Sequence, residues 1–339
     1  MADQGTAKVA PDLTRQGVVQ AHALIMNKIK RTPVLTCESI SLIASTESRP
    51  TTLFFKCENF QKGGAFKLRG ATHALEKLSP EQLRRGVVTH SSGNHAQALA
   101  ITATAKGTKS YIVMPASSAK PKIEGTRGYG GEVYLSGPSS ADRDAMTAQI
   151  KRDTGAIFVP PYDHPDIILG QGTVMLELLE QTSNELNAKL DAVVVPVGGG
   201  GLLAGCALAA QGTGVRVFAA EPAMADDCFR GIASGERVAI VPTTATIADG
   251  LRSPVGAINF PLIQQNVEKI FTATEAEILS AMRLIWERMK IVVEPSSAVP
   301  LAVVLSTAWR QYGVTGNVGI VVTGGNVDMD KAGQLLAGI

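Results

Sequence analysis

Short apolar runs alternate with segments of helical periodicity over most of the chain, and this alternation limits the fold more than any other feature. Runs such as SYIVMP (110–115) and DAVVVPV (191–197) are apolar almost throughout, and helical patterns separate them. Strands joined through helices pair in parallel, and parallel strands are apolar because helices cover both of their faces. The sequence therefore predicts an α/β protein with mostly parallel sheets.

The predicted elements follow this alternation. The predicted strands are TLFFKCENF, GVVTHSS, SYIVMP, GEVYLSG, AIFVPP, DAVVVPV, VRVFAAEP and VGIVVTGGN. The predicted helices are FKLRGATHALEKL, GNHAQALAITATAKG, 120–128, SADRDAMTAQIKRDTG and 167–181. Breaks at Ser79-Pro80 and Pro160-Pro161 bracket a βαβαβα block. We therefore expect a small domain at 81–163, inserted into a large domain made of 1–80 and 164–339.

Composition excludes several classes of function. The chain has 339 residues, which suits about two domains of ~150 residues each, and a net charge of +2 without a Lys/Arg-rich run. This balance argues against a nucleic-acid partner. The four cysteines are widely separated and form no CxxC pair, which favours free thiols in a reducing compartment. The first residues lack the apolar segment of a secretory signal, so we expect a cytoplasmic protein.

The segment AVVVPVGGGGLLAGCALAA (192–210) is uncharged and nearly long enough to cross a bilayer of ~30 Å. However, Pro196 and four consecutive glycines lie in its middle and would break a spanning helix. A buried strand, a glycine loop and a buried helix account for the segment better. We therefore expect no membrane association.

The glycine loop of this segment predicts an anion site. Glycines between a strand and a helix let the backbone approach a ligand closely, and the first N–H groups of the helix point at it. A phosphate group fits such a loop. Gly199-x-Gly201-x-x-Ala204 also satisfies the dinucleotide fingerprint, and Glu221 follows about 20 residues later as a ribose acceptor. An NAD-dependent oxidoreductase and a purely structural packing role therefore remain alternatives.

Lys67 lies in the stretch ENFQKGGAFKLRGA, behind a glycine hinge and next to Phe66. A lysine attacks an aldehyde when burial or nearby cations lower its pKa, whereas a solvated surface lysine needs no such hinge. Alone, Lys67 is compatible with an ordinary surface lysine. Together with a separate phosphate loop, it suggests a pyridoxal 5′-phosphate (PLP) enzyme.

Motifs along nearly the whole chain, from Thr32 to Asp328, resemble those of the serine racemase/threonine dehydratase family of fold-type-II PLP enzymes. They are FQKGGAFKLRGA, SSGNHAQALA, GQGT, VPVGGGGLLAG, AAEPAMADDC, WERMK, EPSSAV and TGGNVD, and they occur in the family's order. The resemblance implies a tryptophan synthase β-like fold with two open, mostly parallel sheets and helices on both faces. It also implies an amino-acid substrate and a homodimer.

The resemblance further implies roles for individual residues in holding the cofactor. Lys67 would carry PLP covalently and Phe66 would pack against the pyridine ring. Asn94 would bond the 3′-oxygen, and Thr323 would face the pyridine nitrogen. A hydroxyl there donates to the nitrogen without fully protonating it, which suits elimination and racemisation. The phosphate would be held by the backbone of Gly198, Gly199, Gly200, Gly201 and Leu202.

The substrate is expected at the strand–helix junction SSGNH. The resemblance implies that Ser91, Ser92, Asn94 and His95 receive the substrate carboxylate and that Arg143 approaches the substrate from the small domain. Ser92 would also be catalytic, as the acid/base group on the face opposite Lys67. Read without the motif, His95 is equally compatible with a capping or core histidine.

A divalent-metal site is implied by EPAMADDC, with Glu221, the Ala225 carbonyl and Asp227 as ligands. All-oxygen ligands suit Mg²⁺, Ca²⁺ or Mn²⁺. Helix capping by Asp226 or Asp227 is the alternative. A metal role for Glu221 also weakens the dinucleotide interpretation.

ATP is a further expected effector, because some racemases of the family bind it at a subunit interface. Gln97, Lys290 and Asn326 fall at the matching motif positions. These motifs would also persist in a protein that binds no nucleotide.

The expected reaction is serine racemisation together with L-serine and L-threonine dehydration to a 2-oxo acid and ammonia. Ser297 and Tyr162 depart from the family pattern, and mammalian serine racemases have asparagine at the Tyr162 position. Gly63-Gly64-Ala65 also replaces the Thr-Gly-Ser of many members. A dehydratase specific for threonine or 3-hydroxyaspartate therefore remains an alternative, as does the oxidoreductase.

Overall fold

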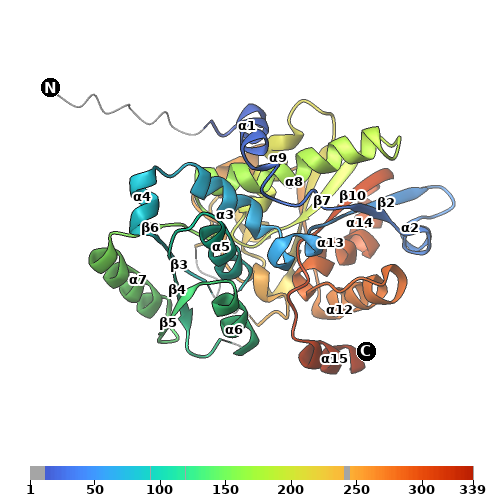
Figure 1. Cartoon of the computed structure of the whole chain (residues 1–339). Coiled ribbons are helices and arrows are strands. Elements are labelled where there is room, and N and C mark those ends of the chain that lie inside the picture. The colour runs from blue at the N-terminus through green and yellow to red at the C-terminus, as the bar shows by residue number, and fades with distance from the viewer. Residues whose placement is uncertain (1–11, 92, 119, 240–244, 339) are drawn as a thin grey trace.

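The computed structural model describes residues 12–91, 93–118, 120–239 and 245–338, which form two sheets with helices around them (Figure 1). The larger sheet has the strand order β1 (Val34–Thr36), β2 (Thr51–Cys57), β10 (Gly316–Val322), β7 (Ala192–Pro196), β8 (Arg216–Pro222) and β9 (Lys269–Ala273). The smaller sheet has the order β5 (Glu132–Ser136), β4 (Ser110–Pro115), β3 (Val87–His90) and β6 (Ile157–Phe158).

All neighbouring strands pair in parallel except β1, which is antiparallel to β2. The predicted fold class, α/β with two mostly parallel sheets, is therefore confirmed.

The helices are α1 (Arg15–Ile25), α2 (Glu38–Ala44), α3 (Lys67–Glu76), α4 (Pro80–Arg85), α5 (Asn94–Ala105), α6 (Lys120–Gly128), α7 (Ser140–Thr154), α8 (Pro165–Asn184), α9 (Gly201–Ala210), α10 (Asp227–Ser234), α11 (Asn259–Asn266), α12 (Glu275–Leu284), α13 (Pro295–Leu305), α14 (Thr307–Tyr312) and α15 (Met329–Ala337).

The larger sheet is buried on both faces because its strands carry apolar side chains at successive positions. Side chains alternate between the faces of a strand. Val193 and Val195 accordingly pack into the core cluster with α8 and α9, whereas Ala192 and Val194 pack into the cluster with α12 and α13. Figure 1 shows α8 and α9 on one side of this sheet and α12, α13 and α14 on the other.

The smaller sheet and its helices form the left half of Figure 1. Helix α5 packs on one face through Leu99 and Ala103, and α7 packs on the other through Ile150. All four strands come from within 81–163, which agrees with the predicted insertion. The domain boundaries themselves remain a prediction.

Every predicted strand is present, but β1 and β9 were not predicted. The segment 192–210 forms β7, the glycine loop and α9, as predicted. Within the described ranges, no helix is both long and apolar enough to cross a membrane. All four cysteines are free thiols.

A buried charge cluster holds α3 against its neighbours. The Arg69 guanidinium donates to both oxygens of Glu58 at 2.7 Å and to both oxygens of Glu177 at 2.7 and 2.8 Å. Lys56 donates to Glu177 at 2.7 Å. All four side chains are at most 1% exposed, and their charges balance. Successive helical residues turn by about 100°, so Arg69 faces away from Lys67, two positions earlier.

Candidate active site

A cavity of about 760 Å³ takes its lining from loops of both sheets. Ligands of open α/β sheets bind outside the carboxyl ends of the strands, and this cavity lies there. It is lined by residues that follow β2, β3, β7 and β10, including Lys67, Ser91, Gly198 and Thr323. The predicted site residues that line it are Phe66, Lys67, Ser91, Asn94, His95, Arg143, Gly198, Gly199, Gly200, Gly201, Leu202 and Thr323.

Lys67 is the first residue of α3 and is placed by the hinge before it. Gly63 and Gly64 have φ values of 73° and 71°, a left-handed region that favours glycine. The Lys67 Nζ donates to the Pro161 carbonyl at 2.8 Å and lies 5.0 Å from the centre of the Phe66 ring. Burial lowers the pKa of Lys67 to about 8, against the opposing attraction of Glu294. The neutral, nucleophilic fraction of this amine near neutral pH is therefore much larger than that of an ordinary lysine.

The glycine loop packs closely against Tyr162 and contains a left-handed residue, and both features require glycine. Gly200 has a φ of +90°, and a Cβ on Gly199 would lie 2.2 Å from Cγ of Tyr162. A Cβ on Gly201 would lie 2.8 Å from the Tyr162 carbonyl oxygen. Helix α9 begins at Gly201, and its N-cap, Gly200, has no side chain to cap the first-turn N–H groups. These donors fit a phosphate monoester, so the residues present fit PLP.

Two amides and two hydroxyls lie near the predicted cofactor position. Asn94 donates through Nδ2 to Glu294 Oε1 at 2.8 Å and accepts from Asn326 Nδ2 at 2.9 Å. Thr323 and Ser297 share a hydrogen bond of 2.9 Å between their hydroxyl oxygens. Asn94 is thus oriented by its neighbours, and the Thr323 hydroxyl is held in place. Their predicted roles toward the cofactor remain proposals.

His95 is buried and hydrogen-bonds through Nε2 to the Val159 carbonyl oxygen at 3.1 Å. Burial and the nearby Lys67 lower the pKa of His95 to about 3, so the ring is neutral. Arg143 donates to the Ser140 hydroxyl at 2.8 Å, and its Nε has no hydrogen-bond partner among the described atoms. Ser92 lies outside the described residues.

Glu294 is a cavity residue that sequence reasoning did not single out. Burial and the nearby Asp249 carboxylate raise the pKa of Glu294 to about 8, so its carboxyl group holds a proton near neutral pH. The signal that could have identified it is the motif EPSSAV, in which a carboxyl group directly precedes Pro295, the first residue of the buried helix α13.

An ion pair between two lining residues joins the surroundings of the two sheets. Lys122 on α6, beside the smaller sheet, donates to Asp249 at 2.6 Å. Asp249 begins the short helix Asp249–Leu251, which belongs with the larger sheet. Both residues line the cavity. This contact was not predicted, because its partners are 127 positions apart in the sequence.

Glu221 and Asp227 lie apart from the cavity lining, at the end of β8 and the start of α10. Both oxygens of Glu221 accept backbone N–H groups, from Cys228 at 2.9 Å and Phe229 at 2.8 Å. Asp227 accepts from the Val255 N–H at 2.8 Å, and its Oδ1 has no partner among the described atoms. The unpartnered, buried oxygen fits a cation. No cluster of three or more His, Cys, Asp or Glu side chains that could hold a metal occurs in the described part of the chain.

The three residues predicted to bind ATP have different structural environments. Asn326 donates to the Gly63 carbonyl at 2.7 Å, and Gln97 is buried in α5. Lys290 has a φ of 60° and directly follows the helical turn Ile285–Met289. ATP binding remains a prediction.

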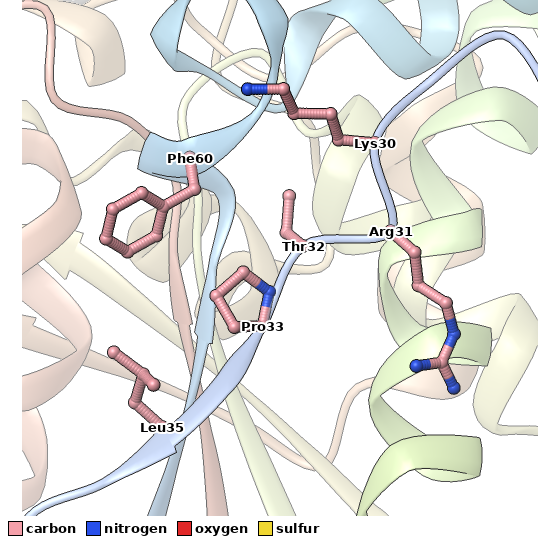
Figure 2. A pocket seen from close by; sticks show the side chains of 6 residues that line it. All are labelled: Lys30, Arg31, Thr32, Pro33, Leu35 and Phe60. Carbon is pink, nitrogen blue, oxygen red and sulfur yellow. The ribbon is translucent and has the colours of Figure 1, made fainter.

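A second, smaller hollow of about 320 Å³ is lined by Lys30, Arg31, Thr32, Pro33, Leu35 and Phe60. Figure 2 shows the Phe60 ring, Pro33 and Leu35 on one side of it, whereas Arg31 extends toward α8. Arg31 pairs there with Glu185. The hollow contains no arrangement of acid, base and nucleophile among its lining residues, so we assign no chemistry to it.

Comparison with known proteins agrees with this geometry. Residues 25–324 match the protein family described as "Pyridoxal-phosphate dependent enzyme". The chain belongs to this family. It is 42% identical to serine racemase of Dictyostelium discoideum, over 96% of this chain and 98% of that protein. It is also 42% identical to β-hydroxyaspartate dehydratase of Paracoccus denitrificans, over 94% of this chain and 98% of that one. The solved structure of maize serine racemase has a TM-score of 0.89 and 38% identity, covering 98% of each chain.

The predicted resemblance and the fold-type-II architecture are therefore confirmed, and the chain is a PLP-dependent enzyme. The NAD-dependent alternative loses its support, because the chain belongs to the PLP-dependent family. Glu221, its expected ribose acceptor, is 1% exposed and accepts the first N–H groups of α10 instead.

Proposed function

We propose that this enzyme is a cytoplasmic serine racemase that also dehydrates L-serine and L-threonine. One observation carries the proposal: the half-buried Lys67 amine and a buried hydroxyl, Thr323, line the same cavity as the glycine loop. A hydroxyl at this position, in place of a carboxylate, suits racemisation and elimination. The similarity to serine racemases along nearly the whole chain supports the choice of reaction.

The residues of the chain would divide the work as follows. Bound PLP supplies an electron sink that stabilises negative charge on the substrate Cα. Lys67 holds the cofactor and then, as a free amine, takes the proton from Cα. Ser91 and Asn94, near the start of α5, orient the substrate carboxylate toward helix N–H groups. His95 stays neutral and cannot compete with Lys67 for this proton.

The fate of the substrate would depend on a second group. Proton delivery by Ser92 to the face opposite Lys67 inverts Cα and completes racemisation. Loss of the β-hydroxyl, after abstraction by Lys67, ends in a 2-oxo acid and ammonia. Only the first outcome requires an acid/base group on both faces.

Chiral analysis of the products tests this proposal. We expect the wild-type enzyme to convert L-serine to D-serine and to pyruvate. Ser92→Ala should reduce L-to-D conversion by about 100-fold or more, the usual effect of a positioned acid/base, while L-serine dehydration survives better. Absence of D-serine in the wild type, or equal loss of both activities in the variant, would refute the racemase assignment.

A dehydratase specific for 3-hydroxyaspartate or threonine is the second candidate. One observation favours 3-hydroxyaspartate: the Arg143 guanidinium lines the cavity and forms no ion pair with a described carboxylate. The similarity to the Paracoccus denitrificans dehydratase agrees with it. A panel of serine, threonine and 3-hydroxyaspartate separates the candidates, because this dehydratase would turn over only its own substrate.

Three further features belong to the proposal. We infer that Glu221, the Ala225 carbonyl and Asp227 bind Mg²⁺, Ca²⁺ or Mn²⁺, which the unpartnered Asp227 Oδ1 supports. We also infer a homodimer, supported by the resemblance to the family alone. ATP is proposed as an effector, supported by the sequence motifs alone.

A further inference from the structure

The segment Pro161–Asp163 connects β6 to α8 and contacts Lys67, the glycine loop and the start of α11 in consecutive residues. The Pro161 carbonyl accepts from Lys67 Nζ at 2.8 Å. The Tyr162 ring lies against Gly199, where a Cβ would be 2.2 Å from Cγ of the ring. Asp163 accepts from the start of α11. One short segment thus borders both the lysine and the glycine loop.

Asp163 is the fixed point of this segment. Its carboxylate accepts three backbone N–H groups: Ala257 at 2.9 Å, Ile258 at 3.0 Å and Asn259 at 3.2 Å. A negative charge at a helix N-terminus is favourable, and hydrogen bonds to an ionised acceptor are stronger than neutral ones. The approach is close, because a Cβ on Gly256 would lie 2.2 Å from the Asp163 carboxyl group.

The same end of α11 is bonded to the glycine loop. The Gly199 carbonyl accepts from the Gly256 N–H at 3.1 Å and from Asn259 Nδ2 at 2.7 Å. Asn259 also donates to the Tyr162 carbonyl at 3.4 Å. The carboxylate, the helix end and the loop therefore form one closed set of hydrogen bonds. We expect a shift of Asp163 to change the orientation of the peptide groups in the loop.

We propose that Asp163 is a positioning residue for the cofactor: through α11 and Asn259 it fixes the Gly199 peptide, so that the loop presents its N–H groups to the phosphate. This role rests on the proposed placement of the phosphate at Gly198–Leu202. Asp163 itself does not line the cavity, so it acts through its contacts and not by touching the cofactor.

The test measures how much the phosphate group contributes to the affinity of the protein for its cofactor. Apoprotein is titrated with PLP and with pyridoxal, and the ratio of their dissociation constants gives that contribution. The imine to Lys67 forms with both aldehydes, and the internal hemiacetal of free pyridoxal is the same for every variant, so both effects cancel when the ratio of a variant is divided by that of the wild type. Asp163→Asn keeps the size of the side chain but removes its charge and turns an NH₂ group toward the N–H donors. We expect the ratio to fall at least tenfold.

Two other variants make the result specific. Asn259→Ala removes the bond to Gly199 from the other end, and should lower the same ratio even if Asp163→Asn folds poorly. Glu277→Gln is the matched control, because Glu277 caps α12 through Thr274 and does not line the cavity. It should lower the thermal midpoint without changing the ratio.

A ratio that stays within twofold of wild type in both Asp163→Asn and Asn259→Ala would overturn the proposal. An equal fall in Glu277→Gln would do the same, because the effect would then be general. A wild-type ratio near one would show that the phosphate does not lie on this loop. A wild type that prefers PLP strongly but makes no D-serine would refute only the proposed activity.

Discussion

At the residue scale, the environment of Lys67 predicts how the apoprotein takes up its cofactor. The neutral amine attacks the aldehyde, and burial brings its pKa down to about 8. The rate of PLP incorporation should therefore rise with pH and level off above a midpoint near 8. Stopped-flow absorbance of the visible band measures it.

Lys67→Ala is the control for this measurement. It should fold and keep the glycine loop, yet show no borohydride-reducible link and negligible turnover. A midpoint near 10.5, the ordinary value for lysine, would mean that the amine is not desolvated in solution. A reducible link in Lys67→Ala would assign the cofactor to another lysine.

Glu294 predicts a loss of stability as the pH rises, whereas Lys67 predicts a gain in the rate of cofactor uptake. Its pKa is raised to about 8 by burial, so the folded protein keeps a proton that the unfolded chain releases above about 4.5. The contribution of Glu294 to the free energy of unfolding is thus fully present below pH 4.5 and is lost as the pH rises toward 8. Glu294→Gln removes this loss and still accepts from Asn94. The free energy of unfolding in urea, measured for Glu294→Gln and for wild type at each pH, should favour the variant more at pH 8 than at pH 5.

Glu294→Ala completes the comparison. It removes the acceptor of the Asn94 amide, which costs about 1–3 kcal/mol when a buried donor is left unpaired. This loss should appear at pH 5 as well as at pH 8. If Glu294→Gln shows the same difference from wild type at both pH values, the carboxyl group is ionised in the folded protein.

At the scale of elements, the buried ion cluster behind α3 predicts that removing one of its members lowers the free energy of unfolding far more than removing one member of an exposed ion pair. Arg69→Met leaves the carboxylates of Glu58 and Glu177 buried with only Lys56 to balance them. Breaking a buried pair from one side costs about 3–5 kcal/mol. Arg85→Met is the matched control, because Arg85 pairs with Glu81 on an exposed helix surface, where such a pair contributes about 0.3–0.5 kcal/mol. Urea denaturation of both variants measures the difference, and equal losses would contradict the prediction.

The elements that the sequence predicts are those with a local cause. The glycine loop was predicted because a run of four glycines between a strand and a helix is typical of an anion site, and Lys67 was predicted because it follows a glycine hinge within a motif that resembles the family. Strand β9 was missed, since it gains its place only by pairing with β8. Asp163 and the Lys122–Asp249 pair were missed for the same physical reason: their partners lie 94 and 127 positions away, and no local pattern records them.

At the scale of the whole molecule, the proposed cation links the end of β8 to the start of α10. Glu221 and Asp227 are both buried, and neither forms an ion pair with a described side chain. A cation that binds only the folded state stabilises it by about 2.7 kcal/mol at 100 times its dissociation constant. Wild-type protein should therefore show a thermal midpoint that rises with added Mg²⁺ or Ca²⁺ and falls with EDTA.

Asp227→Asn should lose this dependence, because the amide is a much weaker ligand, while keeping an acceptor for the Val255 N–H. Asp226→Asn is the matched control, since Asp226 pairs with Arg230 at the surface and should leave the response to Mg²⁺ unchanged. A wild-type midpoint that is the same in EDTA and in Mg²⁺ or Ca²⁺ would exclude the site, and Glu221 would then serve only to cap α10.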